Sequence, residues 1–263
     1  MGFRLVRDMM GRELHVPEIP QRIVSIVPSQ TELLFDLGLE KEVVGITKFC
    51  VHPQEWHRHK TRIGGTKKLH LDKIVALQPD LIIANKEENT RHEIELLAAQ
   101  FPVWISDIKT IDDGLRMIEE IGILVGKSDK ALRIKTEIDE GFSGLKKEAK
   151  TLRVAYFIWR KPWMSAAADT FIHDMIKRIG WQNVYGGHLR YPETSLQELR
   201  LLNPEIILLS SEPYPFSEKH IGEIQSELPE AKILLVDGEM FSWYGSRMKL
   251  AVEYLQELIK SIS

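Results

Sequence analysis

The feature that most constrains the fold is a repeated alternation between short apolar runs and segments of helical periodicity. The run Arg22–Val27 (RIVSIV) is rich in β-branched residues, which is typical of a buried parallel strand that Pro28 would end. The spacing from Ser29 to Glu32 predicts a helical capping box, and Gly38 predicts the end of that helix. Because such pairs recur along the chain, the sequence predicts the α/β class, with parallel sheets covered by helices on both faces.

The strands predicted in this way are Arg22–Val27, Val43–Lys48, Asp80–Asn85, Val103–Ser106, Arg153–Ile158, Glu205–Ser210 and Lys232–Val236. The predicted helices are Thr31–Leu37, Leu71–Leu77, Arg91–Gln100, Ile111–Val125, Asp169–Ile179, Leu196–Leu202 and Ser246–Ile262.

One further segment, from Ser128 to about Lys150, has apolar residues at helical spacing among many charges. About 20 helical residues span about 30 Å, which is long for a crossover helix and suits a strut between two lobes. We therefore expect an N-terminal α/β lobe over residues 1–126, a linking backbone helix over 127–150 and a C-terminal α/β lobe over 151–263.

Two segments of the chain resemble each other. Leu71–Glu87 (LDKIVALQPDLIIANKE) and Leu196–Glu212 (LQELRLLNPEIILLSSE) both read as a short helix, a proline, a strand and a carboxylate. Common helix–proline–strand patterning explains this resemblance, and so do two similar Rossmann-like lobes. Ligands of open α/β sheets bind outside the carboxyl ends of the strands, so two facing lobes would enclose a ligand in a cleft.

The loops after the predicted strands carry an unusual number of aromatic and cationic residues. Exposed aromatic clusters mark binding sites, and arginines beside them fit a bulky, planar, partly anionic ligand. The alternative is that the aromatic residues close the core of the second lobe. The candidate ligand-binding residues are Phe49, Cys50, His52, Lys86, Glu87, Trp159, Arg160, Trp163, Arg190, Tyr191, Glu212, Tyr214, Phe216, Phe241, Trp243, Tyr244 and Arg247.

Composition excludes several classes of protein. The 35 basic and 38 acidic residues give a net charge of −3, which does not suggest a nucleic-acid partner. No apolar window is long enough to span a membrane, and the single Cys50 allows neither an intrachain disulfide nor a cysteine metal cage. His52, His57 and His59 do not have a recognised ligand spacing, so we expect no metal site.

Catalytic motifs are also missing: the chain has no G-x-S-x-G, P-loop, G-x-G-x-x-G or H-E-x-x-H pattern. We therefore expect a protein that is not an enzyme, has no catalytic residues and no cofactor, and binds its ligand noncovalently. A two-lobed enzyme acting on a phosphorylated or sugar substrate and a zinc carrier remain the alternatives from other classes.

Four stretches resemble a known family, namely Arg22–Gly38 (RIVSIVPSQTELLFDLG), Val43–Thr47 (VVGIT), Gly64-Gly65 and Leu71–Ala84 (LDKIVALQPDLIIA). They look like the ABC-transporter solute-binding proteins for cobalamin and ferric siderophores, the helical-backbone metal receptors. This resemblance implies two α/β lobes joined by one long backbone helix, the class III periplasmic binding protein fold. It also implies capture of cobalamin or a related corrinoid between the lobes for uptake, with a ferric siderophore or haem as the alternative ligand.

The resemblance further implies a partner and a compartment. Cobalamin binders of the family present one glutamate on each lobe to a permease; Asp72 stands at the matching place in the first lobe, and Gln197 or Glu198 in the second. We expect Asp72 and Glu198 to dock on an ABC permease, and the protein to be a monomer. The family is periplasmic or extracytoplasmic, whereas the first residues show no signal peptide, so a cytoplasmic location stays open.

Overall fold

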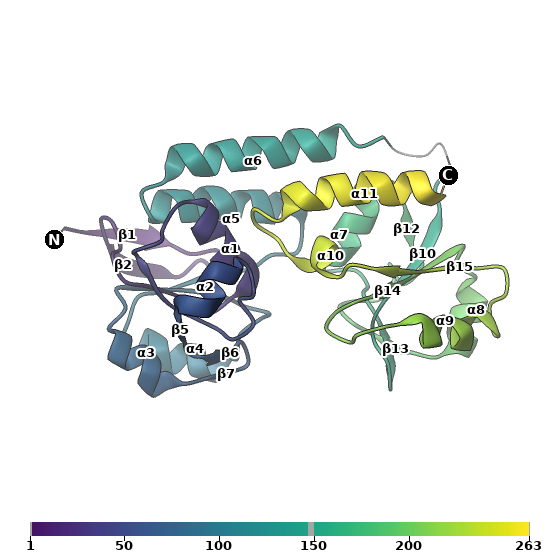
Figure 1. Ribbon diagram of the computed structural model, residues 1–263, viewed down its shortest axis with the longest axis horizontal. Coiled ribbons are helices and arrows are strands. Elements are labelled where there is room, and N and C mark those ends of the chain that lie inside the picture. Colours follow the sequence, from purple (N-terminus) through teal and green to yellow (C-terminus); the bar gives the residue numbers. More distant parts are fainter. Residues whose placement is uncertain (1, 147–149, 263) are drawn as a thin grey trace. The chain divides into compact units, whose positions relative to one another are not determined.

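The chain divides into two units, each built on a sheet with parallel strands at its centre (Figure 1). The computed structural model describes residues 2–146 and 150–262. Unit 1 comprises the described residues up to Ile108 together with Asp112–Asp139 and Tyr244–Met248. Unit 2 comprises Lys109–Ile111, the described part of Glu140–Trp243, and the residues from Lys249 onward. The predicted α/β class with parallel sheets is confirmed.

Unit 1 is built on a five-stranded sheet in the order β5-β4-β3-β8-β9, in which every neighbouring pair is parallel. Its strands are β1 (Phe3–Arg7), β2 (Glu13–Pro17), β3 (Ile23–Ser25), β4 (Val43–Ile46), β5 (Thr61–Arg62), β6 (Gly64–Gly65), β7 (Lys68–Leu69), β8 (Leu81–Asn85) and β9 (Val103–Ser106). Its helices are α1 (Pro28–Asp36), α2 (Gln54–His59), α3 (Leu71–Leu77) and α4 (Arg91–Ala98), with all but the first residue of α5 (Ile111–Leu124) and the first part of α6 (Ser128–Ser143). All residues of β3, β8 and β9 are buried, as expected for a parallel sheet covered on both faces.

Unit 2 is built on a six-stranded mixed sheet. Along the path β13-β11-β10-β14-β15, the strands β10, β14 and β15 are parallel, and β12 pairs with β10. Its strands are β10 (Arg153–Trp159), β11 (Trp163–Ser165), β12 (Gln182–Asn183), β13 (Glu193–Thr194), β14 (Ile206–Ser210) and β15 (Lys232–Val236). Its helices are α7 (Phe171–Arg178), α8 (Leu196–Leu202), α9 (Glu218–Gln225), α10 (Glu239–Ser242) and all but the first residue of α11 (Met248–Ile262).

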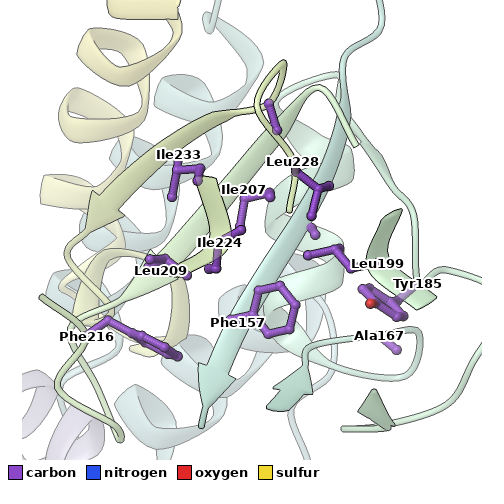
Figure 2. Packing of buried hydrophobic residues seen from close by; sticks show 12 residues of the cluster. Phe157, Ala167, Tyr185, Leu199, Ile207, Leu209, Phe216, Ile224, Leu228 and Ile233 are labelled. Atoms are coloured by element: carbon purple, nitrogen blue, oxygen red, sulfur yellow. The ribbon is translucent and has the colours of Figure 1, made fainter. Parts of the chain in front are cut away.

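The core of unit 2 lies against one face of this sheet (Figure 2). Phe157 of β10 and Ile207 and Leu209 of β14 belong to it, and alternate strand residues face the same side. Leu199 of α8 and Ile224 of α9 cover them. None of the helices in the part of the chain that the structure describes has both the length and the apolarity needed to cross a membrane.

An N-terminal hairpin of β1 and β2 was not predicted from the sequence. The two strands pair antiparallel from Phe3 opposite Pro17 to Arg7 opposite Glu13. The buried Asp8 holds the turn, because its carboxylate accepts hydrogen bonds from the backbone N–H and the guanidinium of Arg12. Sequence reasoning weighed only the charges of this segment, not its alternation.

The two resembling segments fold alike. In each unit a seven-residue helix, α3 or α8, ends in a left-handed residue, Gln78 (φ 45°) or Asn203 (φ 43°). Pro79 and Pro204 follow, and then the buried strands β8 and β14. The helices have the predicted bounds, and the strands begin one residue later than predicted.

In each unit, an arginine outside the repeated segment donates hydrogen bonds to the C-terminus of its helix. Arg22, just before β3, donates to the backbone carbonyl of Leu77 at 2.6 Å, at the end of α3. Arg153, the first residue of β10, donates to the backbone carbonyls of Leu202 and Asn203, at the end of α8. A cation at a helix C-terminus stabilises the unpaired carbonyls there.

The structure corrects two of the sequence predictions. Pro28 does not end a strand; it is the first residue of α1, a position that its fixed φ favours, and Val27 is the N-cap, so no capping box joins Ser29 to Glu32. The helix expected over 127–150 is α6, which ends at Ser143. Residues 147–149, like residues 1 and 263, lie outside the described residues.

Candidate functional site

Four aromatic side chains lie together at the carboxyl ends of β10 and β14. Trp159 and Tyr214 make an edge contact with ring centroids 5.6 Å apart, and Tyr214 and Phe216 make another at 4.8 Å. Phe216 and Trp163 are stacked at 5.9 Å with nearly parallel planes. We call Trp159, Trp163, Tyr214 and Phe216 the aromatic cluster; all four were predicted as ligand contacts from their places after the strands.

The aromatic cluster belongs partly to the core and partly to the surface. Phe216 is buried, and Trp163 and Tyr214 pack against the core of unit 2. Trp159, in contrast, is 40% exposed. The sequence left a binding surface and a closed core as alternatives. The aromatic cluster has features of both, because three of its rings pack in or on the core while Trp159 is exposed.

A cation lies beside the aromatic cluster. The guanidinium carbon of Arg160 lies 5.6 Å from the centroid of the Trp163 ring, and its Nη2 pairs with Glu223 of α9 at 2.6 Å. In the neighbouring loop, Arg190 lies over the ring of Tyr191 at 5.5 Å. Cation–π contacts of this kind hold a charge at the border of an aromatic surface.

Glu212, also predicted as a ligand contact, is held by a hydrogen-bond network within unit 2. Its Oε1 accepts hydrogen bonds from the Ser242 hydroxyl at 2.8 Å and the Trp243 indole N–H at 3.0 Å. Its backbone carbonyl accepts from the Ser210 hydroxyl, which in turn accepts from the hydroxyl of the buried Tyr156. The network ties the end of β14 to α10.

Burial raises the pKa of the Glu212 carboxyl group. The hydrogen bond from Ser242 opposes that shift, the negative charge of Glu239 adds to it, and smaller effects come from Trp243 and Asp237. A raised carboxyl pKa in a buried network means that the neutral, protonated form is favoured relative to a glutamate in water.

Three predicted contacts occupy other places than expected. Phe241 is fully buried and packs against Tyr156 at 5.0 Å, within unit 2. Tyr244 and Arg247 belong to unit 1 and are buried there. Arg247, expected as a ligand contact, makes a two-pronged ion pair with Glu32 of α1, at 2.8 and 2.7 Å.

Unit 1 has its own group of predicted contacts at the carboxyl ends of its strands. Phe49 is 49% exposed, and the ammonium group of Lys48 lies 4.9 Å from its ring centroid. Lys86, after β8, pairs with Asp107 at 2.6 Å. His52 and Glu87 are half-buried in the same set of loops.

A buried polar scaffold beneath these loops was missed. Asn85 Oδ1 accepts from the backbone N–H groups of Glu87 at 2.8 Å and Glu88 at 3.0 Å, while its Nδ2 donates to Ser106. Asn89 Oδ1 accepts from the Asn85 N–H at 2.8 Å. The signal that could have found it is the asparagine at the end of a buried strand, a residue type that favours turns.

The sulfur of Cys50 lies between two threonine hydroxyl groups. Cys50 is fully buried, and its sulfur lies 3.1 Å from the Thr31 hydroxyl and 3.2 Å from that of Thr47. Burial raises the pKa of the thiol, so the protonated form is favoured. Across residues 2–146 and 150–262, no three His, Cys, Asp or Glu side chains are grouped so that they could hold a metal ion.

The described geometry can be compared with known proteins. The family model described as periplasmic binding protein matches residues 23–231. A vitamin B12-binding protein of Pectobacterium carotovorum is 23% identical over 253 residues, which cover 93% of this chain and 90% of the relative.

Two solved structures have the same fold at low sequence identity. The periplasmic vitamin B12-binding protein BtuF of Vibrio cholerae has a TM-score of 0.74 at 20% identity and covers 93% of this chain and 98% of that structure. The periplasmic heme-binding protein HutB of the same organism has a TM-score of 0.77 at 20% identity, with coverages of 91% and 98%. These likenesses give the fold as that of the class III periplasmic binding proteins, as the resemblance implied. Because the family model covers most of the chain, this protein belongs to the periplasmic binding protein family.

Proposed function

We propose that this protein is a solute-binding protein that captures cobalamin or a related corrinoid for uptake by an ABC transporter. The observation that carries the proposal is the aromatic cluster at the carboxyl ends of β10 and β14, where open α/β sheets bind their ligands. Family membership favours this interpretation over a two-lobed enzyme.

The chemistry of the cluster suits a large ring system with polar substituents. Trp159 offers an indole side chain that is 40% exposed and makes an edge contact with Tyr214. Stacking on such a ring contributes about 0.5–1.5 kcal/mol beyond the buried area. Arg160 supplies a donor for amide, carboxylate or phosphate oxygens at the rim of the ligand. In unit 1, we propose Phe49, His52, Lys86 and Glu87 as further contacts.

The function is tested by titrating the purified protein with cyanocobalamin, cobinamide, haem and a ferric hydroxamate siderophore. Isothermal titration calorimetry measures each affinity. We expect the two corrinoids to bind more tightly than the other two ligands. Tighter binding of haem or the siderophore would instead assign the alternative ligand class, and binding of none of the four would reject the proposal.

A matched pair of tryptophan variants ties the ligand to the aromatic cluster. Trp159→Ala should weaken corrinoid binding, because Trp159 is the exposed member of the cluster. Trp104→Phe, a fully buried position in unit 1, should leave the affinity unchanged. Equal affinities for the two variants would place the ligand elsewhere.

The permease partner and an extracytoplasmic location are part of the proposal. Asp72 is exposed in the first turn of α3, and Glu198 lies in the first turn of α8, where its carboxylate accepts a hydrogen bond from Thr194 at 3.0 Å. The repeat aligns Asp72 with Gln197, so the two carboxylates are not at equivalent positions.

The docking role of these carboxylates has a direct test. Asp72→Lys combined with Glu198→Lys should leave corrinoid affinity intact and abolish stimulation of the reconstituted permease ATPase, because charges at a rim orient the encounter. Stimulation at the wild-type level would show that neither carboxylate docks.

A further inference from the structure

A histidine that sequence reasoning did not single out lies behind the aromatic cluster. His220, in the first turn of α9, is 2% exposed, and its ring contacts the rings of Tyr214 at 5.4 Å and Phe216 at 5.3 Å. Its two ring nitrogens have different partners. Nδ1 lies 2.9 Å from the backbone nitrogen of Ser217, and Nε2 lies 3.1 Å from the hydroxyl oxygen of Tyr214.

These partners determine which nitrogen carries the proton. The Ser217 N–H can only donate, so Nδ1 must accept its hydrogen bond through a lone pair. The Ser217 carbonyl lies 3.2 Å from the same nitrogen, but a proton on Nδ1 would meet the Ser217 N–H across 2.9 Å. The neutral ring therefore carries its proton on Nε2, which donates to the Tyr214 oxygen.

This assignment has a consequence for Tyr214. Once its oxygen accepts from His220, the phenolic proton must be donated to something else. Within the described ranges, His220 is the one hydrogen-bond partner of the Tyr214 hydroxyl. Tyr214 is half-buried and part of the aromatic cluster, so an acceptor from a bound molecule can complete its hydrogen bonding.

We infer that His220 is a positioning residue that makes the Tyr214 hydroxyl a hydrogen-bond donor to an oxygen acceptor on the bound ligand. The inference rests on the proposed function of the aromatic cluster, and it adds that the ligand carries an amide, carboxylate or phosphate oxygen at this point. Tyr214 thus recognises the polar periphery of the ligand rather than its ring plane.

The surroundings of His220 keep the neutral ring favoured. Burial lowers the pKa of His220; the Ser217 carbonyl opposes that shift, Lys219 and Arg160 add to it, and Glu223 opposes it. Because the folded-state pKa lies below the ordinary 6.5, the ring in the folded protein becomes protonated only at a pH below that value. A protonated ring would lose the hydrogen bond from the Ser217 N–H, but its Nε2–H would still donate to Tyr214.

The first experiment needs no ligand. Long-range ¹H–¹⁵N NMR of ¹⁵N-labelled protein at pH 7.5 reports the tautomer of each histidine, and the His220 signal is assigned by its loss in His220→Gln. We expect an Nε2–H tautomer for His220. An Nδ1–H tautomer would overturn the inference, because Nε2 would then accept from Tyr214.

The second experiment measures cyanocobalamin affinity in three variants between pH 5 and 8. His220→Glu keeps an acceptor for the Ser217 N–H, since glutamate is an ordinary residue at this place in a capping box, but its carboxylate has no proton to donate to Tyr214. Tyr214→Phe removes the hydroxyl. Each should lower the affinity about three- to tenfold at pH 7.5, and the double variant should lose no more than either alone.

Two controls keep the result interpretable. His92→Gln, at an exposed site on α4 of unit 1, should bind as wild type at every pH. Protonation of His220 at low pH should not by itself lower the wild-type affinity, because the protonated ring still donates from Nε2 to Tyr214. Wild-type binding by Tyr214→Phe or His220→Glu overturns the inference while leaving the proposed function intact. If the wild-type protein binds none of the four ligands, the proposed function fails and the donor role falls with it.

Discussion

We expect that removal of either partner of the buried ion pair between Arg247 and Glu32 strongly destabilises unit 1. Their side chains are 7% and 14% exposed, and the two bonds of 2.8 and 2.7 Å make the pairing bidentate. Removing one partner of such a pair leaves an uncompensated buried charge and costs about 3–5 kcal/mol. We therefore expect Arg247→Met to destabilise unit 1 by about that amount.

The measurement is urea unfolding followed by circular dichroism and tryptophan fluorescence. With a slope of about 1–3 kcal/mol per M, a loss of this size moves the transition midpoint by more than 1 M. The two units can unfold in separate steps, so two probes are needed. Arg91→Ala is the matched control: it breaks an ion pair with Glu95 whose side chains are 92% and 59% exposed, and it should shift the midpoint little.

A double variant distinguishes an unpaired buried charge from lost packing as the cause of the destabilisation. Arg247→Met with Glu32→Leu removes both charges of the pair and should recover most of the stability that the single variant loses, because Glu32 no longer leaves a buried charge without its arginine. If the double variant is as unstable as the single one, lost packing rather than an unpaired charge explains the effect. If Arg247→Met unfolds at the wild-type urea concentration, the ion pair with Glu32 contributes nothing measurable to the stability of unit 1.

Three further outcomes are expected. Trp163→Ala should lower the free energy of unfolding of unit 2 by about 2 kcal/mol, because the Trp163 ring stacks on the buried Phe216. Trp159→Ala should change it by less than about 1 kcal/mol. Equal urea midpoints for the two variants would contradict this. The stability of Glu212→Gln relative to wild type should rise between pH 5 and pH 8. The raised pKa of Glu212 stabilises the wild-type fold below the ordinary value of 4.5, and the wild type loses this contribution as the pH rises through the raised pKa, whereas the neutral glutamine does not titrate. A pH profile of stability equal to that of the wild type would refute this. Asn85→Ala should lower the free energy of unfolding by about 1–3 kcal/mol, since the partly buried N–H groups of Glu87 and Glu88 lose their acceptor. An unchanged midpoint in thermal or urea unfolding would mean that water takes the place of the Asn85 side chain as acceptor.

The parts of the fold that could be predicted from the sequence are those with a local signal, such as a proline after a helix or a short apolar run. The bounds of α3 and α8 were predicted correctly because a proline follows each helix closely, and β9 and β15 because they are short apolar runs. The two-residue strands β5, β6 and β7 could not be predicted, since no periodicity can be read from two residues. Pro28 was ambiguous, because proline can end a strand or open a helix.

The candidate site was predicted less well than the fold. Position after a strand correctly grouped Trp159, Tyr214 and Phe216, because the carboxyl ends of parallel strands share one edge of a sheet. It could not show that Phe241 faces the interior, because burial depends on what packs above a residue. The pairing of Arg247 was also hidden, since Glu32 lies 215 positions away in the sequence.

The equivalent arginines at the start of β3 and β10 have a consequence for protein engineering. In both units the amino-terminal edge of the sheet carries the same hydrogen bonding, from Arg22 to the end of α3 or from Arg153 to the end of α8. The opposite edge differs, with a polar asparagine scaffold in unit 1 and aromatic rings in unit 2. Redesign of the loops after β8 and β14 would leave the hydrogen bonding of Arg22 and Arg153 intact, provided that it keeps Asn85, Asn89 and Phe216, which anchor those loops within their own units.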